Sequence, residues 1–184
     1  LIDTAGLEDA DNISLEGRMR QQTERAVDDA HLTLFMIDGR AGLTPMDEHF
    51  ASWLRMQKKP VLLLANKCEG SAGESGRLEA YSLGLGDPIA VSSEHGQGLS
   101  DLYDAMTEMA QMTHPTIDDI DASELSGDVS SRPLSLAIVG RPNVGKSTMV
   151  NYLLGEDRML TGSEAGITRD AIAVPWSWEG RQVQ

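Results

Sequence analysis

The chain has 184 residues, of which 40% are apolar, so it can bury the core of one ordinary domain or of parts of two. Its 15 basic and 29 acidic residues give a net charge of −14, which argues against direct electrostatic binding to nucleic acid. No apolar run has membrane-spanning length, so we expect no membrane partner. The single Cys68 permits no intrachain disulfide, which favours a reducing compartment such as the cytoplasm.

The chain opens on Leu1 rather than on a methionine, and its first residues look like the end of a strand, so we expect a fragment of a longer protein. A D-x-x-G pattern follows, formed by Asp3, Thr4, Ala5 and Gly6. Such a pattern is weak alone because Asp and Gly are common in turns. In nucleotide hydrolases, however, the aspartate holds Mg²⁺ through water and the glycine N–H faces the γ-phosphate. A helix is expected from Ser14 to about Ala30.

Strand-like and helix-like stretches alternate over the next eighty residues. The expected strands are Leu32–Ile37, Pro60–Ala65 and Pro88–Val91. The expected helices are Pro45–Gln57 with Thr44 as its cap, a weak one near Arg77–Ser82, and the amphipathic Leu99–Met112. One face of the first of these helices is expected in the core, with Met46, Phe50, Trp53 and Leu54.

The second strand delivers Asn66, Lys67, Cys68 and Glu69. Guanine presents N1–H and a 2-amino group on one edge, and a carboxylate can accept both, whereas adenine lacks this donor pair. Asn66 can bond the N7/O6 side, and the Lys67 stem can cover the ring. The usual guanine motif is N-K-x-D, so Glu69 keeps the carboxylate one methylene further out. Without other motifs, the stretch could be no more than a polar exit from a strand.

A loop of Ser92, Ser93, Glu94, His95 and Gly96 follows the third strand. In this position a Ser-Ala-Lys-like loop supports guanine through backbone N–H groups, and Ser93 and Glu94 depart from that form. His95 could be a base, but we favour a loop role because no nucleophile is adjacent in sequence. Residues 114–133 are acidic and contain one basic residue, Arg132, at their end; they indicate a flexible spacer, with docking as an alternative.

The most specific motif is G-x-x-x-x-G-K-[ST], a phosphate-binding P-loop. It consists of Gly140, Arg141, Pro142, Asn143, Val144, Gly145, Lys146, Ser147 and Thr148. Glycines let backbone N–H groups approach phosphate oxygens, Lys146 reaches the β/γ-phosphates, and Ser147 offers a hydroxyl to Mg²⁺. The apolar run Leu134–Val139 predicts a strand before the loop. Residues Met149–Leu154 predict a helix after it, which Gly155 ends.

Thr168 lies in a polar stretch between the P-loop helix and an expected strand, Ala171–Trp178. A switch threonine that closes on Mg²⁺ and the γ-phosphate would lie in this position, although a lone threonine is more often a helix cap or a strand residue. A turn at Glu179-Gly180 and a further strand from Arg181 to Gln184 are expected next.

In order, these motifs resemble P-loop GTPases, and more narrowly the tandem-domain bacterial Der (EngA) family of the Era/TrmE-like group. The resemblance implies an α/β P-loop fold with a three-layer, mostly parallel sheet. It also implies GTP and GDP binding, Mg²⁺-dependent hydrolysis by the parent protein, and a role in assembly of the large ribosomal subunit. Leu7 stands where Ras-like enzymes carry a water-positioning glutamine. Some relatives of that type use K⁺ held by a P-loop asparagine, and Asn143 occupies that place.

The resemblance divides the chain into three parts. Residues 1–113 match the C-terminal part of a first G domain, 114–133 the linker, and 134–184 the N-terminal part of a second G domain. Each part holds motifs that the other lacks, so the two could also complement each other as one circularly permuted G domain. Three other interpretations stay open: a nucleotide-gated ribosome-binding module with little turnover, an ATP-using P-loop protein, and an inert fragment.

Overall fold

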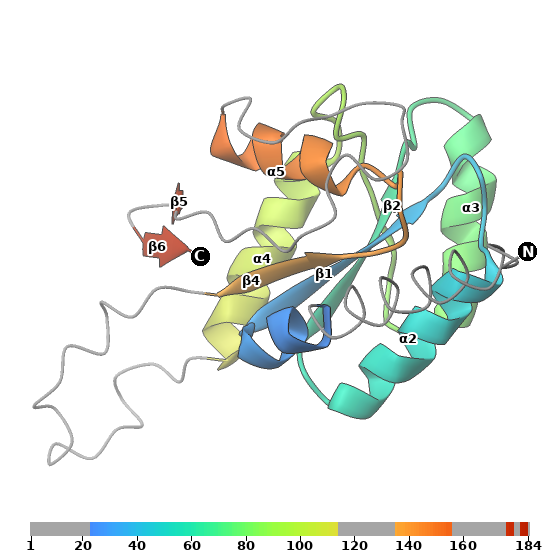
Figure 1. Cartoon of the computed structure of the whole chain (residues 1–184). Helices are drawn as coiled ribbons and strands as arrows, with labels where there is room; N and C mark the ends of the chain where they lie inside the picture. The colour runs from blue at the N-terminus through green and yellow to red at the C-terminus, as the bar shows by residue number, and fades with distance from the viewer. Residues whose placement is uncertain (1–22, 114–134, 156–175, 179–180, 184) are drawn as a thin grey trace, which may run out of the picture.

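The computed structural model describes residues 23–113, 135–155, 176–178 and 181–183. A four-stranded parallel sheet with strand order β3-β2-β1-β4 carries helices on both faces (Figure 1). This three-layer arrangement confirms the α/β fold that the motifs predict. In the described part of the chain, no helix is both long and apolar enough to cross a bilayer.

The four strands are short and mostly buried. They are β1 (Leu32–Asp38), β2 (Val61–Asn66), β3 (Ile89–Ala90) and β4 (Leu136–Val139). All seven residues of β1 are buried, because the strand lies between two others and is covered on both faces. Such strands read as continuous apolar runs in sequence, which is why the expected positions of β1, β2 and β4 are confirmed to within two residues.

The helices are α2 (Pro45–Gln57), α3 (Ala72–Ala80), α4 (Leu99–Thr113) and α5 (Lys146–Leu154), with a further helical stretch at residues 23–29. The start of α2 is the expected one: Thr44 and Asp47 form a capping box ahead of the proline turn. The expected helix Arg77–Ser82 is wrong in extent, since α3 begins at Ala72. A Cβ on Gly76 would fall onto the Gly39 carbonyl, so the glycines that weaken helix propensity allow close packing here.

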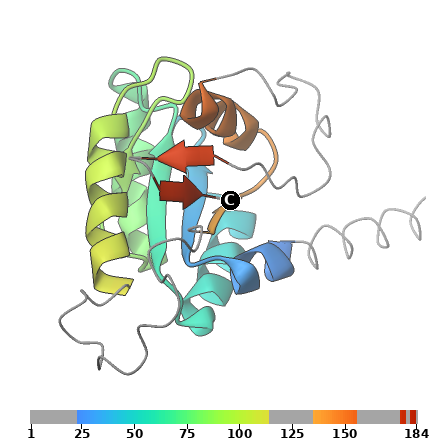
Figure 2. The same ribbon diagram turned by 90° about the vertical axis from the view of Figure 1, so that its left-hand side faces the viewer.

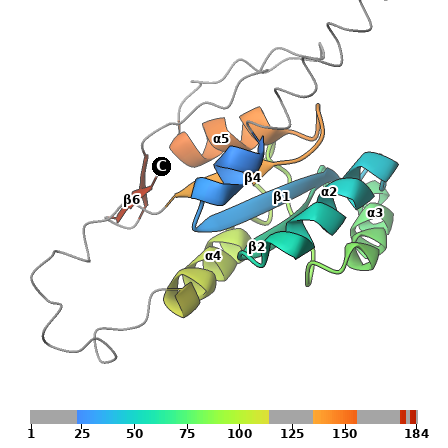
Figure 3. The ribbon, with the colours of Figure 1, turned by 60° about the horizontal axis from the view of Figure 1, so that its bottom comes forward.

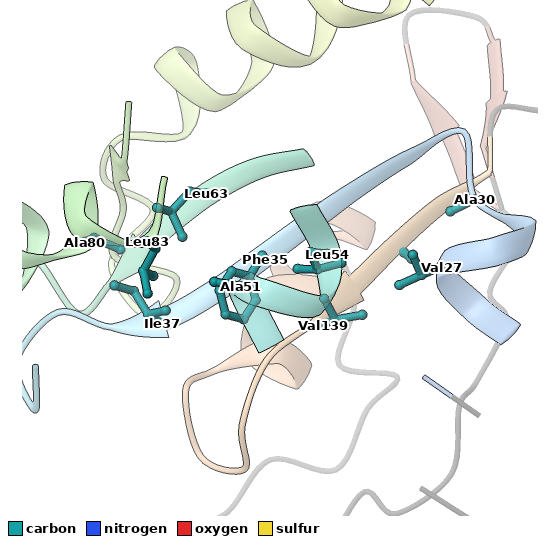
Figure 4. Packing of buried hydrophobic residues seen from close by; sticks show 12 residues of the cluster. Val27, Ala30, Phe35, Ile37, Ala51, Leu54, Leu63, Ala80, Leu83 and Val139 are labelled. Carbon is teal, nitrogen blue, oxygen red and sulfur yellow. The ribbon is translucent and has the colours of Figure 1, made fainter. Parts of the chain in front are cut away.

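One face of the sheet is covered by α4 and α5, and the other by residues 23–29, α2 and α3 (Figures 1 and 2). Alternation along β1 divides the core: Leu34 and Met36 face the first layer, and Phe35 and Ile37 face the second. The second cluster brings side chains of α2, of α3 and of the short 3-10 helix η1 (Tyr81–Leu83) onto the strands, as Figure 4 shows for Ala51, Leu54, Ala80 and Leu83.

The expected core face of α2 needs one correction. Met46 is 51% exposed, whereas Leu54 is buried and Phe50 and Trp53 are partly buried. Met46 lies in the first turn, and the inward side of that turn is taken by Asp47, which is fully buried. A polar contact described below explains why a carboxylate occupies this position.

Strand β4 joins the sheet from a segment more than 100 residues along the chain from β1. Its residues pair in register with β1, with Leu136 opposite Leu32 and Val139 opposite Phe35. Both faces of β4 enter the shared core: Ala137 and Val139 belong to one cluster, and Leu136 and Ile138 pack against the other. Residues 135–155 therefore complete the sheet that residues 23–113 begin.

A separate antiparallel pair, β5 (Trp176–Trp178) and β6 (Arg181–Val183), agrees with the strands expected there, whereas the expected turn at 179–180 lies outside the described residues. The expected features at residues 1–22, 114–134 and 156–175, the acidic spacer among them, lie outside the described residues.

Candidate functional site

The site lies at the carboxyl ends of β1, β2 and β4. The helix that follows β1, α2, covers one face of the sheet, whereas the helix that follows β4, α5, covers the opposite face (Figure 3). Where two adjacent parallel strands send their connections to opposite faces, the strand ends leave room for a ligand. The P-loop motif occupies this position, between β4 and α5.

Two glycines fit the P-loop against the rest of the sheet. Gly140 has φ +150° and Gly145 has φ +103°, backbone conformations that side chains other than glycine rarely adopt. A Cβ on Gly140 would fall onto the Met36 carbonyl oxygen, and one on Gly145 onto the Asn66 amide. Both glycines of the motif are therefore required by contacts with the other segment, as well as by the loop's own curvature.

Lys146 is the first residue of α5, three residues before the expected helix start. Its Nζ donates to the carbonyl oxygens of Gly140 and Arg141, at 2.8 and 2.9 Å. Burial lowers the pKa of Lys146 from 10.5 to about 8, and the nearby Arg141 charge adds to this. The hydrogen bonds of the ammonium to described residues thus go to carbonyl dipoles, so an anion at the α5 N-terminus would stabilise its charge.

Asn66 connects the P-loop to the loop after β3. Its Nδ2 donates to the Val144 carbonyl at 2.7 Å, and its Oδ1 accepts from the Ser93 N–H at 2.9 Å and from the Ser93 hydroxyl at 3.0 Å. The side chain is only 2% exposed. A buried amide with all these partners fixes three loops relative to one another.

Lys67 makes a second link between the two segments. Its Nζ donates to the Asn143 carbonyl at 3.0 Å and to Asp38 Oδ2 at 2.7 Å. Lys67 and Asn143 both have positive φ, at 63° and 64°, which turns the two loops toward each other. Asp38 is itself buried, and burial alone would raise its pKa. The hydrogen bonds from Lys67 and from the Ala41 N–H outweigh burial, so the pKa of Asp38 is lowered.

The other residues of the loops that follow β2 and β3 differ in their burial and in their contacts. The Glu69 carboxylate pairs with the Arg40 guanidinium. Cys68 is half-buried beneath the loop, its Sγ 3.4 Å from the Gly73 carbonyl, and burial raises the pKa of its thiol. Ser92 is buried and Glu94 is exposed. Asn66, Lys67 and Ser93 therefore connect to the P-loop directly or through one bond, whereas Glu94 does not.

Sequence reasoning missed one contact that fixes the P-loop to α2. Arg141 Nε donates to Asp47 Oδ2 at 3.2 Å, and that same oxygen accepts from the Thr44 N–H and hydroxyl. The pattern Thr44-x-x-Asp47 predicts a capping box from sequence. It does not show that Asp47 also accepts a hydrogen bond from Arg141, which lies 94 residues away along the chain.

Ser147 and Thr148 lie in the first turn of α5, next to Lys146. The D-x-x-G residues Asp3, Thr4, Ala5 and Gly6, with Leu7 and the expected switch Thr168, lie outside the described residues. Within the described residues, no three His, Cys, Asp or Glu side chains cluster as a metal site. This does not bear on a P-loop Mg²⁺, whose ligands are hydroxyl and phosphate oxygens.

A parallel α/β sheet with a P-loop at its switch point defines a P-loop nucleotide-binding fold. A family model described as "50S ribosome-binding GTPase" matches residues 1–67 and 135–184, more than half of the chain. The chain belongs to this family.

Curated proteins named GTPase Der are similar over the whole chain. The chain is 56% identical to the one from Azorhizobium caulinodans over 185 residues, covering all of this chain and 41% of that protein. It is 54% identical over 200 residues to the one from Parvibaculum lavamentivorans and 47% identical over 209 residues to the one from Brucella suis, covering 42% and 43% of those proteins. The chain thus spans about 40% of the length of these relatives.

Proposed function

We propose that this chain binds GTP and GDP at one site built by both of its segments, and that the protein containing it hydrolyses GTP. The observation that carries the proposal is the pair of links across the segments: Asn66 to the Val144 carbonyl, and Lys67 to the Asn143 carbonyl. They place the end of β2, which bears the guanine-type motif, directly beside a phosphate-binding loop.

In this proposal the phosphates lie against the loop from Gly140 to Thr148, where backbone N–H groups and Lys146 neutralise their charge. The base lies over Asn66, Lys67 and Glu69, with Ser92, Ser93 and Glu94 forming the loop beside it. The carboxylate of Glu69 selects guanine, because adenine has no adjacent pair of N–H donors on that edge.

Mg²⁺ is the expected cofactor, and the described part of the site fits it. Ser147 lies one residue after Lys146 in the first turn of α5, beside the phosphate-binding loop, and a serine hydroxyl is an oxygen ligand of the kind that Mg²⁺ takes. Thr168 would supply a second hydroxyl, and Asp3 and Gly6 would contact bound water and the γ-phosphate. Bound Mg²⁺ neutralises charge on the β- and γ-phosphates during hydrolysis.

We further propose that Asn143 contributes to a K⁺ site. Its side chain is exposed while its backbone is held by Lys67, so its amide oxygen remains accessible to an ion. Hydrolysis by the full-length protein should be faster in K⁺ than in Na⁺, and equal rates in the two salts would contradict a K⁺ role.

The family description, 50S ribosome-binding GTPase, supports a role for the full-length protein on the large ribosomal subunit, which we expect to be exercised in the cytoplasm. Sedimentation of that protein with 50S particles, with a non-hydrolysable GTP analogue compared with GDP, tests this role. Nucleotide-independent or absent co-sedimentation would contradict it.

The nucleotide proposal is tested by titrating fluorescent GDP into the 184-residue chain, with unlabelled GTP and ATP as competitors. GTP should displace the probe, and ATP should not at about 100-fold higher concentration, the discrimination expected when a site's hydrogen-bonding groups are left unpaired. Lys146→Ala should weaken binding at least about 100-fold. Lys58→Asn is the matched control, because it removes an exposed charge at the left-handed end of α2. Equal competition by ATP, or binding unaffected by Lys146→Ala, would overturn the proposal.

A further inference from the structure

The contact between Arg40 and Glu69 is not explained by the phosphate site or by the sheet. We propose that Arg40 is a positioning residue for guanine selectivity, which holds one oxygen of the Glu69 carboxylate so that the group faces the base edge. This inference rests on the proposed function, since it deepens the account of how the base is recognised.

The backbone of Arg40 is fixed relative to the guanine loop. The Gly39 N–H donates to the Asn66 carbonyl at 2.7 Å, and Asp38 Oδ1 accepts from the N–H groups of Arg40 and Ala41, both at 3.0 Å. The other Asp38 oxygen accepts from Lys67. One carboxylate therefore anchors both the turn that carries Arg40 and the loop that carries Glu69.

The close fit between these two loops requires glycine at position 39. A Cβ there would lie 2.7 Å from Cys68 Sγ and 3.1 Å from the Asn66 carbonyl oxygen. Glycine lets the turn approach within reach of Glu69, so the Arg40 guanidinium meets the carboxylate at Oε1. The backbone contacts of the two loops therefore bring Arg40 and Glu69 within reach of each other.

The second oxygen of Glu69, Oε2, has no hydrogen bond among the described residues, although it is shielded from water. The carboxylate is charged at neutral pH, as an ordinary glutamate is, and its own backbone N–H, the nearby Ser92 hydroxyl and the Arg40 charge lower the pKa of Glu69 further. A charged acceptor with one oxygen held and one oxygen unsatisfied is suited to a ligand that offers N–H donors.

The extra methylene of glutamate explains why such a contact is useful. A glutamate has one more rotatable bond than the aspartate of the usual motif, so its carboxylate samples more orientations when free. A guanidinium restricts it, because its donors lie in a rigid plane. The side chain of Arg40 is 58% exposed, so the pair adds little to folding stability, and its effect should appear in ligand selectivity instead.

Inosine diphosphate is a suitable probe of this effect. Its base keeps the N1–H of guanine and lacks the 2-amino group, so the ratio of GDP to IDP affinity reports how well the carboxylate meets both donors. We would measure both affinities on the 184-residue chain, with Arg40→Ala, Arg40→Lys, and Arg77→Ala as a matched control. Arg77 also pairs with a glutamate, Glu74, but within α3.

Arg40→Ala should lower the GDP/IDP affinity ratio about fivefold, as expected for loss of one partly exposed charge-assisted hydrogen bond. Arg40→Lys should restore part of the ratio, and Arg77→Ala should leave it unchanged. In a Glu69→Asp background the effect of Arg40→Ala should be smaller, because the shorter side chain no longer reaches the guanidinium.

An unchanged ratio in Arg40→Ala, in a chain that still prefers GDP to ATP, would overturn the inference and leave the proposed function intact. A rise in GDP affinity would also overturn it, since Arg40 would then compete with the base. If the unsubstituted chain binds neither GDP nor IDP, the proposed function and this inference fail together.

Discussion

The two segments build their sides of the site in different ways. Residues 140–146 form the proposed phosphate side mainly from backbone: two glycines at positive φ bring the loop against β1 and β2, and Lys146 bonds to the loop's own carbonyls. The proposed guanine side depends on side chains, chiefly Asn66, Lys67 and Glu69. The difference teaches that the guanine side holds the phosphate side in place, because its side chains bond to P-loop carbonyls.

Replacing Asn66 should have the largest effect on this arrangement. Asn66→Ala leaves the buried Val144 carbonyl and Ser93 N–H without their partner, which should lower the free energy of unfolding by about 2–4 kcal/mol. Guanidinium denaturation measures this loss. Ser93→Ala removes only one of two donors to the same oxygen and should cost about 1 kcal/mol or less. Equal losses in the two variants would show that the link to the P-loop contributes little.

The Arg141–Asp47 pair joins the P-loop to α2, so its loss tests the support of the phosphate side independently of the guanine side. Asp47→Ala should lower the free energy of unfolding by about 3 kcal/mol, because it leaves Arg141 without its carboxylate and removes the α2 cap. Arg141→Ala should cost about 1–2 kcal/mol, because Asp47 keeps its bonds to Thr44. Thermal unfolding of both variants, with Thr44→Ala as the control for the cap alone, checks the order. A larger cost for Arg141→Ala would contradict it.

The lowered pKa of Lys146 predicts a pH dependence on the phosphate side. Phosphate favours the charged ammonium, so GDP affinity should fall by about fourfold from pH 7 to about pH 8.5, as the free chain loses the proton. Titrations across this range measure the effect, and the residual binding of Lys146→Gln should lack the decline.

The effect of rising pH on folding stability is opposite in sign to its effect on GDP affinity. In the nucleotide-free chain the unfolded state binds more protons than the folded state between about pH 8 and 10.5, so the contribution of Lys146 to the free energy of unfolding rises over that range. Denaturation of the unsubstituted chain and of Lys146→Met at both ends of the range should show this rise only in the former.

A smaller effect is expected where α5 meets the loop after β3. Gly96 has φ +66°, and a Cβ there would meet the Tyr152 side chain. Gly96→Ala should therefore lower the free energy of unfolding by about 1 kcal/mol, mainly through backbone strain. Tyr152→Ala in the same chain should recover only the steric part. Full recovery would mean that the conformation of residue 96 is not strained.

The sequence predicts the fold well because buried parallel strands and a capped helix have strong local patterns. Strand β1, strand β2 and the start of α2 fall close to where the apolar runs and Thr44-Pro45 indicate. The extent of α3 is not predictable in this way, because its glycines are tolerated for their packing against Gly39. Met46 is misplaced for a related reason: a buried ion pair at Asp47 takes the inward position.

The site is predicted in part. The P-loop and the guanine-type loop each have a spacing that identifies them, and the structure brings them together through Asn66 and Lys67. The contacts of Arg40 and Arg141 are not predictable, because they depend on which loops meet across 29 and 94 residues of sequence. The sequence motifs show which residues are present but not which side chains they contact.

The central claim is that one nucleotide contacts both segments of this chain. Amide hydrogen exchange with and without GDP tests it most directly, because it reports on each loop separately. The account predicts slower exchange in residues 140–147 and also in residues 66–69 and 92–96, with all of this protection lost in Lys146→Ala. Protection confined to residues 140–147 would contradict it, since the guanine-type loops would then take no part in binding.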